Sequence, residues 1–436
     1  MVKKSIIFLL GFMFLVQEPS WSSSSMETMT LEDCIRYGLD HNPEVKAYTL
    51  AVDEAKLGVS EAKGAFFPTL TLGYNYNQLS SGNSNDRDTD YLDQNSDSYS
   101  VRLSQPLFAG FSSVAGLNRA RQSRAYREAE LVYMRQQLVK EVRTSFYNYI
   151  QSNQRAHEWQ ASVERLERQK DIAAAWVKQQ LAPRLRLLET EVELSNARHQ
   201  LIRAQSEERI AAAQLRQWLA LEADAPLNLS GAFDESLTIP CIDLPQCLSL
   251  GLERRPDLQL AKLNIDMARE DARVILARNL PQVQLEGGYT DYQRDYDDSR
   301  YGEDKRDYFS VTLNLSMKPF QGGRNIAAWR KQRIAVNRYE QQLNAARLQV
   351  TSDVETRFQQ LDEARARIAN AHDTIKEARA AYEVASRSAE LGVVSLDDLL
   401  NAELRLTRAE INLIDSRAAE ALARVALDYA IGVPTP

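Results

Sequence analysis

The chain of 436 residues has almost no long apolar segment. Its one extended run, from Ile6 to Val16, is shorter than the stretch of about 20 residues that a transmembrane helix needs. A membrane location would therefore require an architecture other than spanning helices. Because Lys3 and Lys4 precede the run and a small, polar stretch from Pro19 to Ser25 follows it, the pattern is typical of a secretory signal peptide, expected at residues 1–24. The alternative is a buried N-terminal helix.

Cysteine is scarce, and three residues are too few for a disulfide framework. Cys34 and Cys247 stand in similar contexts, three residues after Leu31 and Leu244, where a small apolar helix residue is suitable. We expect both to pack in a core. Pairing of Cys241 with Cys247 is the alternative in an oxidising compartment.

Motifs for catalysis and for nucleic-acid binding are also missing. The four histidines are scattered without metal-ligand spacing, and there is no Gly-x-x-x-x-Gly-Lys phosphate loop. A formal net charge of −7 argues against a general nucleic-acid binder, which would carry a basic face. We therefore expect no cofactor, no metal and no enzymatic activity.

The sequence does contain an internal repeat. The segment from Leu31 to Tyr76 reappears from Leu244 to Tyr289 with constant spacing. Matching positions include Cys34, Gly38, Pro43, Pro68 and Leu72 in the first copy and Cys247, Gly251, Pro256, Pro281 and Leu285 in the second. Further on, Phe108-Ala109-Gly110 matches Phe320-Gln321-Gly322, and Leu187 to Glu191 matches Leu399 to Glu403. The pattern predicts a tandem duplication, with repeats at 25–230 and 231–436.

Each repeat is expected to hold a helix, two strands, a very long helix and a shorter return helix. The strands are predicted at about 68–78, 98–108, 281–292 and 307–317, where apolar and polar residues alternate. Ten residues of the apolar faces are expected to contact lipid: Leu70, Leu72, Tyr74, Val101, Leu103, Val283, Leu285, Val311, Leu313 and Leu315. Soluble hairpins, with one face on a core and one in water, are the alternative.

The ends of these strands suit a membrane boundary. Each strand has about the length that crosses a bilayer when tilted. Aromatic residues lie near the ends, where interfacial girdles form, and include Phe66, Phe67, Phe108, Tyr292, Tyr308 and Phe320. The polar segments from Ser80 to Ser98 and from Gln293 to Asp307 are expected to form a solvated outer rim.

Four strands cannot close a barrel in lipid, because an open sheet edge would leave backbone groups without hydrogen-bond partners. The chain must therefore share its strands with copies of itself. Two copies would give eight strands and an interior filled by side chains, whereas three would give twelve and leave room for a lumen. Strand number alone does not choose between them.

Proline is absent and glycine almost absent from 110–180 and from 322–390, which permits two helices of around 70 residues. Such helices would be about 100 Å long. Apolar and small residues recur at sevenfold spacing, which predicts coiled-coil packing: Trp159, Leu166 and Ala173 in the first, and Leu361, Ile368, Ile375 and Tyr382 with Ala364, Ala371, Ala378 and Ala385 in the second. The return helices should have about 37 residues each. A solvated coiled-coil rod would account for these repeats but not for the strands.

These features together resemble the TolC family of outer-membrane efflux proteins. The resemblance rests on Asn42-Pro43 and Arg255-Pro256, on the duplicated opening and strand exits, and on Leu391-Gly392 followed by Leu399 to Glu403. It implies a homotrimer with a twelve-stranded β-barrel in the outer membrane and a long α-helical coiled-coil barrel in the periplasm. It also implies an exit duct of a tripartite efflux or type I secretion system, which contacts a periplasmic adaptor protein and an inner-membrane pump.

The resemblance further implies where the adaptor docks and where the channel narrows. The docking tips would be the turns at Gln180–Leu185 and Leu391–Leu396, with Leu181, Ala182, Pro183, Leu391, Gly392, Val393 and Ser395. In the first turn, Ala182-Pro183 replaces the glycine expected of the family. Asp398 and Asn401 would stand at the periplasmic constriction, where three carboxylates would favour cations. Alternatively, Asp397 and Asp398 only stabilise the start of a helix.

One rival of another class is a surface or periplasmic coiled-coil protein with a structural or adhesive role. It would have polar residues on both faces of its strands, or a single stalk without duplication, and the sequence has neither. Drugs, metal ions and proteins would leave by the same type of duct, so the sequence does not name the cargo.

Overall fold

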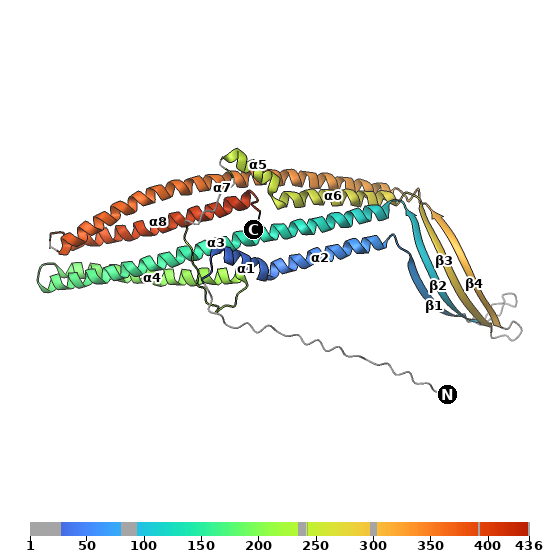
Figure 1. Ribbon diagram of the computed structural model, residues 1–436, viewed down its shortest axis with the longest axis horizontal. Helices are drawn as coiled ribbons and strands as arrows, with labels where there is room; N and C mark the ends of the chain where they lie inside the picture. The colour runs from blue at the N-terminus through green and yellow to red at the C-terminus, as the bar shows by residue number, and fades with distance from the viewer. Residues whose placement is uncertain are drawn as a thin grey trace, which may run out of the picture.

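The computed structural model describes residues 28–79, 94–233, 241, 243–296, 303–390 and 393–434. The predicted signal peptide at 1–24 and the predicted tip residues Leu391 and Gly392 lie outside these ranges. The described part is a long rod with the strands at one end and two helix-to-helix turns at the other (Figure 1).

Two halves of the chain contain the same elements in the same order. The first half has α1 (Leu31–His41), α2 (Pro43–Gly64), β1 (Thr69–Leu79), β2 (Gln94–Ala109), α3 (Ser112–Lys178) and α4 (Arg184–Leu219). The second has α5 (Leu244–Arg254), α6 (Pro256–Ala277), β3 (Gln282–Tyr296), β4 (Glu303–Ser316), α7 (Arg324–Glu390) and α8 (Leu396–Ala430).

Each half begins with two helices, whereas one was predicted. The break falls at Asn42 and at Arg255, which have extended backbones with ψ of 126° and 124°. Both residues precede a proline, and the proline ring disfavours helical geometry in the residue before it. Proline then starts the next helix, where its missing N–H costs nothing.

The strands form one antiparallel sheet in the order β1-β2-β3-β4. Three of them are longer than predicted, since β2 begins at Gln94, β3 reaches Tyr296 and β4 begins at Glu303. The loops predicted at 80–98 and 293–307 were therefore too long, because both segments include strand residues. Backbone pairing continues through polar residues, as in Asn77 opposite Ser96, because the ladder does not depend on side-chain polarity.

The helices form a wall that continues the sheet. Along α3 lie α2 and α4, one after the other, and along α7 lie α6 and α8 (Figure 1). Because α3 also packs against α6 and α8, the order across the wall is α2 and α4, then α3, then α6 and α8, then α7. The two long helices have 67 residues each, or about 100 Å. The return helices have 36 and 35 residues, close to the prediction.

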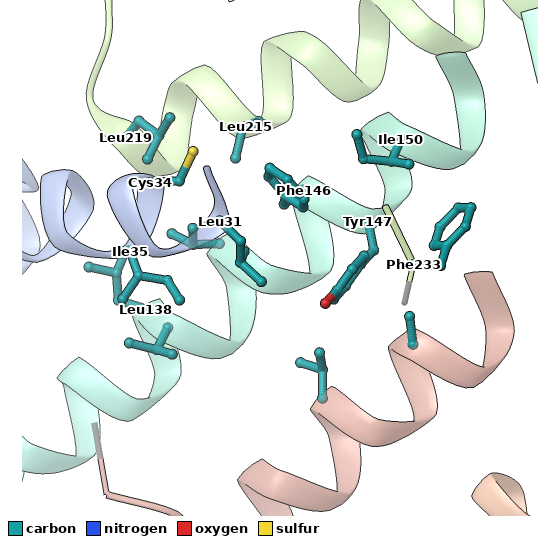
Figure 2. Packing of buried hydrophobic residues seen from close by; sticks show 14 of the residues in the cluster. Leu31, Cys34, Ile35, Leu138, Phe146, Tyr147, Ile150, Leu215, Leu219 and Phe233 are labelled. Carbon is teal, nitrogen blue, oxygen red and sulfur yellow. The ribbon is translucent and has the colours of Figure 1, made fainter. Parts of the chain in front are cut away.

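Two apolar cores lie near the middle of the rod, where α1 and α5 pack on the long helices. Figure 2 shows the first, in which α1 contributes Leu31 and Cys34, and α3 contributes Phe146 and Tyr147. The second contains Cys247, Leu258, Val350, Val354 and Leu427. Of the predicted heptad residues, Leu166, Ala173, Leu361, Ala364 and Ala371 are buried. The others are half-buried: Trp159, Ile368, Ile375, Ala378, Tyr382 and Ala385.

The cysteines show both predicted features, core packing and a disulfide between Cys241 and Cys247. Cys34 and Cys247 are fully buried in the cores, as predicted, and burial raises the pKa of the free Cys34 thiol to about 12. Cys247 also forms a disulfide with Cys241, six residues earlier. The bond ties Cys241 to the first turn of α5.

Cys241→Ser is expected to lower the stability of the second core by about 2 kcal/mol, because the bond closes a short loop in the unfolded chain. The variant leaves Cys247 as a buried thiol, which is the state of Cys34 in the first half. Thermal unfolding followed by circular dichroism would measure the change. A reductant should lower the melting temperature of the native protein to that of the variant and leave the variant unchanged; equal melting of both proteins without reductant would contradict the prediction.

Candidate channel wall, tip and buried charge network

The register of the sheet divides its residues between two faces. One rung joins Leu72, Val101, Tyr289 and Phe309, and another joins Leu70, Leu103, Gly287 and Val311. Residues directly opposite one another share a face. All ten residues predicted to contact lipid therefore lie on the same face: Leu70, Leu72, Tyr74, Val101, Leu103, Val283, Leu285, Val311, Leu313 and Leu315. The other face is polar, with Thr71, Arg102, Gly288 and Ser310 on one rung.

Two aromatic pairs lie on the apolar face near the middle of the strands. Tyr74 packs on Tyr99, and Tyr289 packs on Phe309, each with ring centroids 4.8 Å apart. The assignment of Tyr292 and Tyr308 to an interfacial girdle was wrong. Tyr292 is opposite Ser98 and Tyr308 is opposite Thr290, so both lie on the polar face.

The first turn at the tip closes without glycine. Gln180 adopts φ +62°, a backbone conformation that usually favours glycine. Its N–H donates to the carbonyl of Val177, and the N–H of Leu181 donates to that of Trp176, which together form a Schellman motif. Pro183 then precedes α4. The sequence departs from the family at Ala182-Pro183, but the helix end that glycine would form is made by Gln180.

The second turn has the same closing bond. The N–H of Val393 donates to the carbonyl of Ser388, 212 positions after the bond from Leu181 to Trp176. Ser395 then caps α8: its hydroxyl accepts from the N–H of Asp398 at 3.2 Å and donates to the Asp398 carboxylate at 2.6 Å. Ser395 is thus the N-cap of α8, and the Asp398 carboxylate supports the cap only through the Ser395 hydroxyl.

The predicted constriction residues share an exposed face of α8. Asp398 and Asn401 are exposed, and Arg405 and Arg408 continue the same side of the helix one and two turns further. Asp397 points elsewhere, and its carboxylate accepts from Arg186 Nη1 of α4 at 3.0 Å. This ion pair joins the two turns at the tip and was not predicted.

A second group that was not predicted is a buried charge network between α3, α7 and α8. The Arg165 guanidinium of α3 donates through Nε to both carboxylate oxygens of Glu403, at 2.8 and 2.9 Å. Glu403 is fully buried and also accepts from the Ser162 hydroxyl at 3.1 Å. Glu158 and Glu410 flank the guanidinium at 2.9 and 3.4 Å, and Glu410 also accepts from Arg379 of α7 at 3.2 Å.

A local signal for this network was present. Leu396, Leu399, Glu403, Leu406 and Glu410 follow one another at the three- and four-residue spacing of a coiled-coil seam. A carboxylate in such a seam must find a cation, because burying it alone is costly. The partner is 238 residues away in the chain, so spacing could not name it.

Two carboxylates of the network share their environment. Burial and the adjacent Glu158 raise the pKa of Glu410 to about 7. Burial also opposes the charge of Glu158, but hydrogen bonds with Glu410 and Arg165 outweigh it and hold its pKa below the usual value. The pair therefore retains one proton near neutral pH, on Glu410.

Glu410 is expected to make the wall less stable as the pH rises from 4.5 to 7. Its pKa is higher in the folded chain than in the unfolded one, so the folded chain binds more protons in this range and loses that advantage as the pH rises. Glu410→Gln imitates the protonated form and should flatten the dependence. Melting temperatures between pH 6 and pH 8 would test this, since burial raises the pKa of Asp428 only to about 6. An equally steep slope in the variant would exclude Glu410 as the source.

Comparison with known proteins adds to this geometry. No helix in the described part of the chain is both long and apolar enough to span a membrane. The sequence profile of a family described as "Outer membrane efflux protein" matches residues 35–221 and again residues 247–433. The chain belongs to the outer membrane efflux protein family. It is an outer-membrane exit duct of efflux systems, with its helical part in the periplasm.

Relatives and solved structures agree with this family. The outer membrane protein TolC of Salmonella enteritidis is 23% identical over 90% of this chain and 79% of its own length. TolC of Escherichia coli strain K12 is 23% identical over 86% of this chain and 76% of its own. Among solved structures, the outer-membrane channel OprN superposes with a TM-score of 0.77 at 18% identity, covering 92% of this chain and 89% of OprN. The CmeC channel of Campylobacter jejuni has a TM-score of 0.76 at 14% identity, covering 95% and 90%. The sheet and the helical wall of the efflux protein therefore share the fold of these solved structures.

Proposed function

We propose that three copies of the chain close into one passive duct, with a twelve-stranded barrel and a helical tunnel. The observation that carries this proposal is the pair of open edges on each chain. β1 and β4 are the edges of the sheet, and the same two sides of the wall end in α2 with α4 and in α7. Head-to-tail rotation brings β4 of one copy beside β1 of the next. These strands run in opposite directions, so the new pair is antiparallel.

Exposed apolar residues on the helices at the two edges of the wall support the same contact between copies. Leu50 and Leu57 of α2 are 67% and 72% exposed, and Ile334 and Leu348 of α7 are 69% and 73% exposed. Exposed apolar residues on the two free sides of the wall suit a contact between copies. Three copies rather than two leave a lumen, which an exit duct needs. In this arrangement the polar face of the sheet lines the lumen and the ten apolar residues contact lipid.

We propose that a tandem duplication gave each chain two equivalent parts, so that three chains supply six equivalent parts of the wall. The twofold match of one family profile and the identical element order support it. Packing supports it as well: Gly38 approaches Val142 and the carbonyl of Trp218, and Gly251 approaches Val354 and the carbonyl of Ala430. A Cβ at Gly251 would lie only 3.1 Å from Val354 of α7, whereas a Cβ at Gly38 would make ordinary contact with Val142 of α3 at 3.5 Å.

At the periplasmic end, the two turns are proposed to dock an adaptor protein that connects the duct to an inner-membrane pump. Leu181 and Val393, at matching positions of the turns, are 68% and 77% exposed. Exposed apolar residues at a tip are suited to a protein contact. The remaining predicted tip residues that the structure describes, Ala182, Pro183 and Ser395, lie in the same two turns.

The function is tested by measuring mass and conductance of the purified full chain. We expect native mass spectrometry to find three chains and planar bilayers to show discrete pores. Asp398→Ala should reduce cation selectivity if Asp398 lines the constriction, because it removes three carboxylates from the pore. Ser395→Ala is the matched control, since it breaks the same cap without changing charge. A monomer without pores would contradict the duct, and equal reversal potentials in all three proteins would leave Asp398 with its capping role alone.

A further inference from the structure

A cavity of about 540 Å³ lies where the second half of the sheet meets the helices. Its walls carry three cationic side chains, Arg278 at the end of α6, Lys318 after β4 and Arg324 at the start of α7. Among the described residues, no carboxylate forms an ion pair with any of them. Arg324 Nη2 donates only to the Gln321 amide oxygen at 2.8 Å. The cavity therefore concentrates positive charge that the described chain does not neutralise.

The other half of the chain provides an internal comparison. The corresponding junction between α2, β2 and α3 encloses a cavity of about 160 Å³, lined by Phe66, Leu107, Phe108, Phe111 and Val114 among others. At the positions that match Arg278, Lys318 and Arg324, the first half has Ala65, Pro106 and Ser112. The repeated fold thus forms the junction without any cation. Arg278, Lys318 and Arg324 need a reason other than folding.

The position of the cavity along the rod indicates which class of anion it could bind. It lies below the last rung of the sheet, where Gln282 is opposite Ser316, at the end from which the helices continue into the periplasm (Figure 1). Large apolar side chains stand beside the cations: Met317 lines the cavity and is 52% exposed, and Phe320 is 82% exposed. Cationic heads next to apolar surface are the two features that a phospholipid requires at a membrane boundary.

We propose that this junction cavity binds the phosphate headgroup of an anionic phospholipid from the periplasmic leaflet of the outer membrane. Arginine donates pairs of hydrogen bonds to phosphate oxygens, and lysine adds a compact charge. Gln321 lines the same cavity, and its amide nitrogen supplies a further donor. The acyl chains lie along Met317 and the apolar face of β4. The assignment shares with the proposed function the placement of the sheet in the membrane.

The test uses native mass spectrometry of the full chain, purified in mild detergent and incubated with phosphatidylglycerol, phosphatidylethanolamine or glycerol 1-phosphate. The pocket variant is Arg278→Gln/Lys318→Gln/Arg324→Gln. The matched control is Arg347→Gln/Lys376→Gln/Arg387→Gln, which removes the same charge from exposed positions of α7. We expect phosphatidylglycerol adducts on the native protein and on the control, at least tenfold fewer on the pocket variant, and fewer with phosphatidylethanolamine.

Equal adducts on both triple variants would overturn the proposal, and so would saturation by glycerol 1-phosphate with no preference for the lipid. If the pocket variant fails to assemble, Lys318→Gln alone decides: several-fold fewer adducts support the lipid site, and unchanged adducts overturn it. Conductance is recorded on the same samples. A native protein that binds the lipid but forms no pore would reject the duct and leave the lipid site standing.

Discussion

Replacing Arg165 by methionine is expected to destabilise the helical wall by about 3–5 kcal/mol per chain. The fully buried Glu403 takes two hydrogen bonds from this guanidinium, and without it the carboxylate stays buried with only hydroxyl donors nearby. Leaving a buried charge unpaired costs far more than a pair contributes. Thermal or urea unfolding, followed by circular dichroism, would show the loss as an early transition.

Two further variants separate the buried pair from ion pairs in general. Arg165→Met/Glu403→Leu removes both charges and should recover most of the lost stability, because the unpaired carboxylate is gone. Arg198→Met removes an exposed pair with Glu167, whose side chains are 57% and 47% exposed, and should cost less than about 1 kcal/mol. If Arg165→Met were no worse than Arg198→Met, the network would contribute nothing particular to the wall.

The network also explains where prediction from sequence stops. The seam positions of Glu403 and Glu410 are visible in the spacing, but the cation that pairs with Glu403 is Arg165 from the other half of the chain, whereas Glu410 also accepts from Arg379 of its own half. Glu191, which matches Glu403 in the first half, remains 44% exposed beside Lys170. The repeat therefore does not dictate the buried charge, and only the packing of α3 against α8 reveals it.

Local patterns succeeded where the geometry is local. An alternation of two residues assigned all ten apolar strand residues to one face, because successive residues of a strand point to opposite sides. The same parity places Tyr292 and Tyr308 on the polar face, whereas their closeness to the strand ends suggested a girdle. Helix lengths followed from the missing prolines, whereas the turn at Gln180 did not, since glutamine only rarely adopts a positive φ.

The buried pair holds the wall together within one chain, whereas the apolar strand face concerns the assembled barrel. Leu313→Arg is expected to reduce assembly of the duct more than any single substitution in the helical wall. Leu313 is 64% exposed in the chain and lies opposite Leu285 on the apolar face. An arginine on a lipid-facing strand costs about 2–4 kcal/mol near the middle of the bilayer, and the proposed trimer would carry the substitution three times, for about 6–12 kcal/mol in total. Leu72→Arg, on the same face of β1, should act in the same way.

Asn314→Arg supplies the matched control, because its side chain belongs to the polar face, opposite Gln284. There the guanidinium meets water in the lumen, so assembly should be close to normal while conductance changes. The measurement is the amount of heat-resistant oligomer recovered from the outer-membrane fraction. If Leu313→Arg assembled as well as the native chain, or if Asn314→Arg were the more damaging of the two, the lipid would have to lie on the other face of the sheet. The proposed trimer would then need its polar face outward, which no bilayer would stabilise.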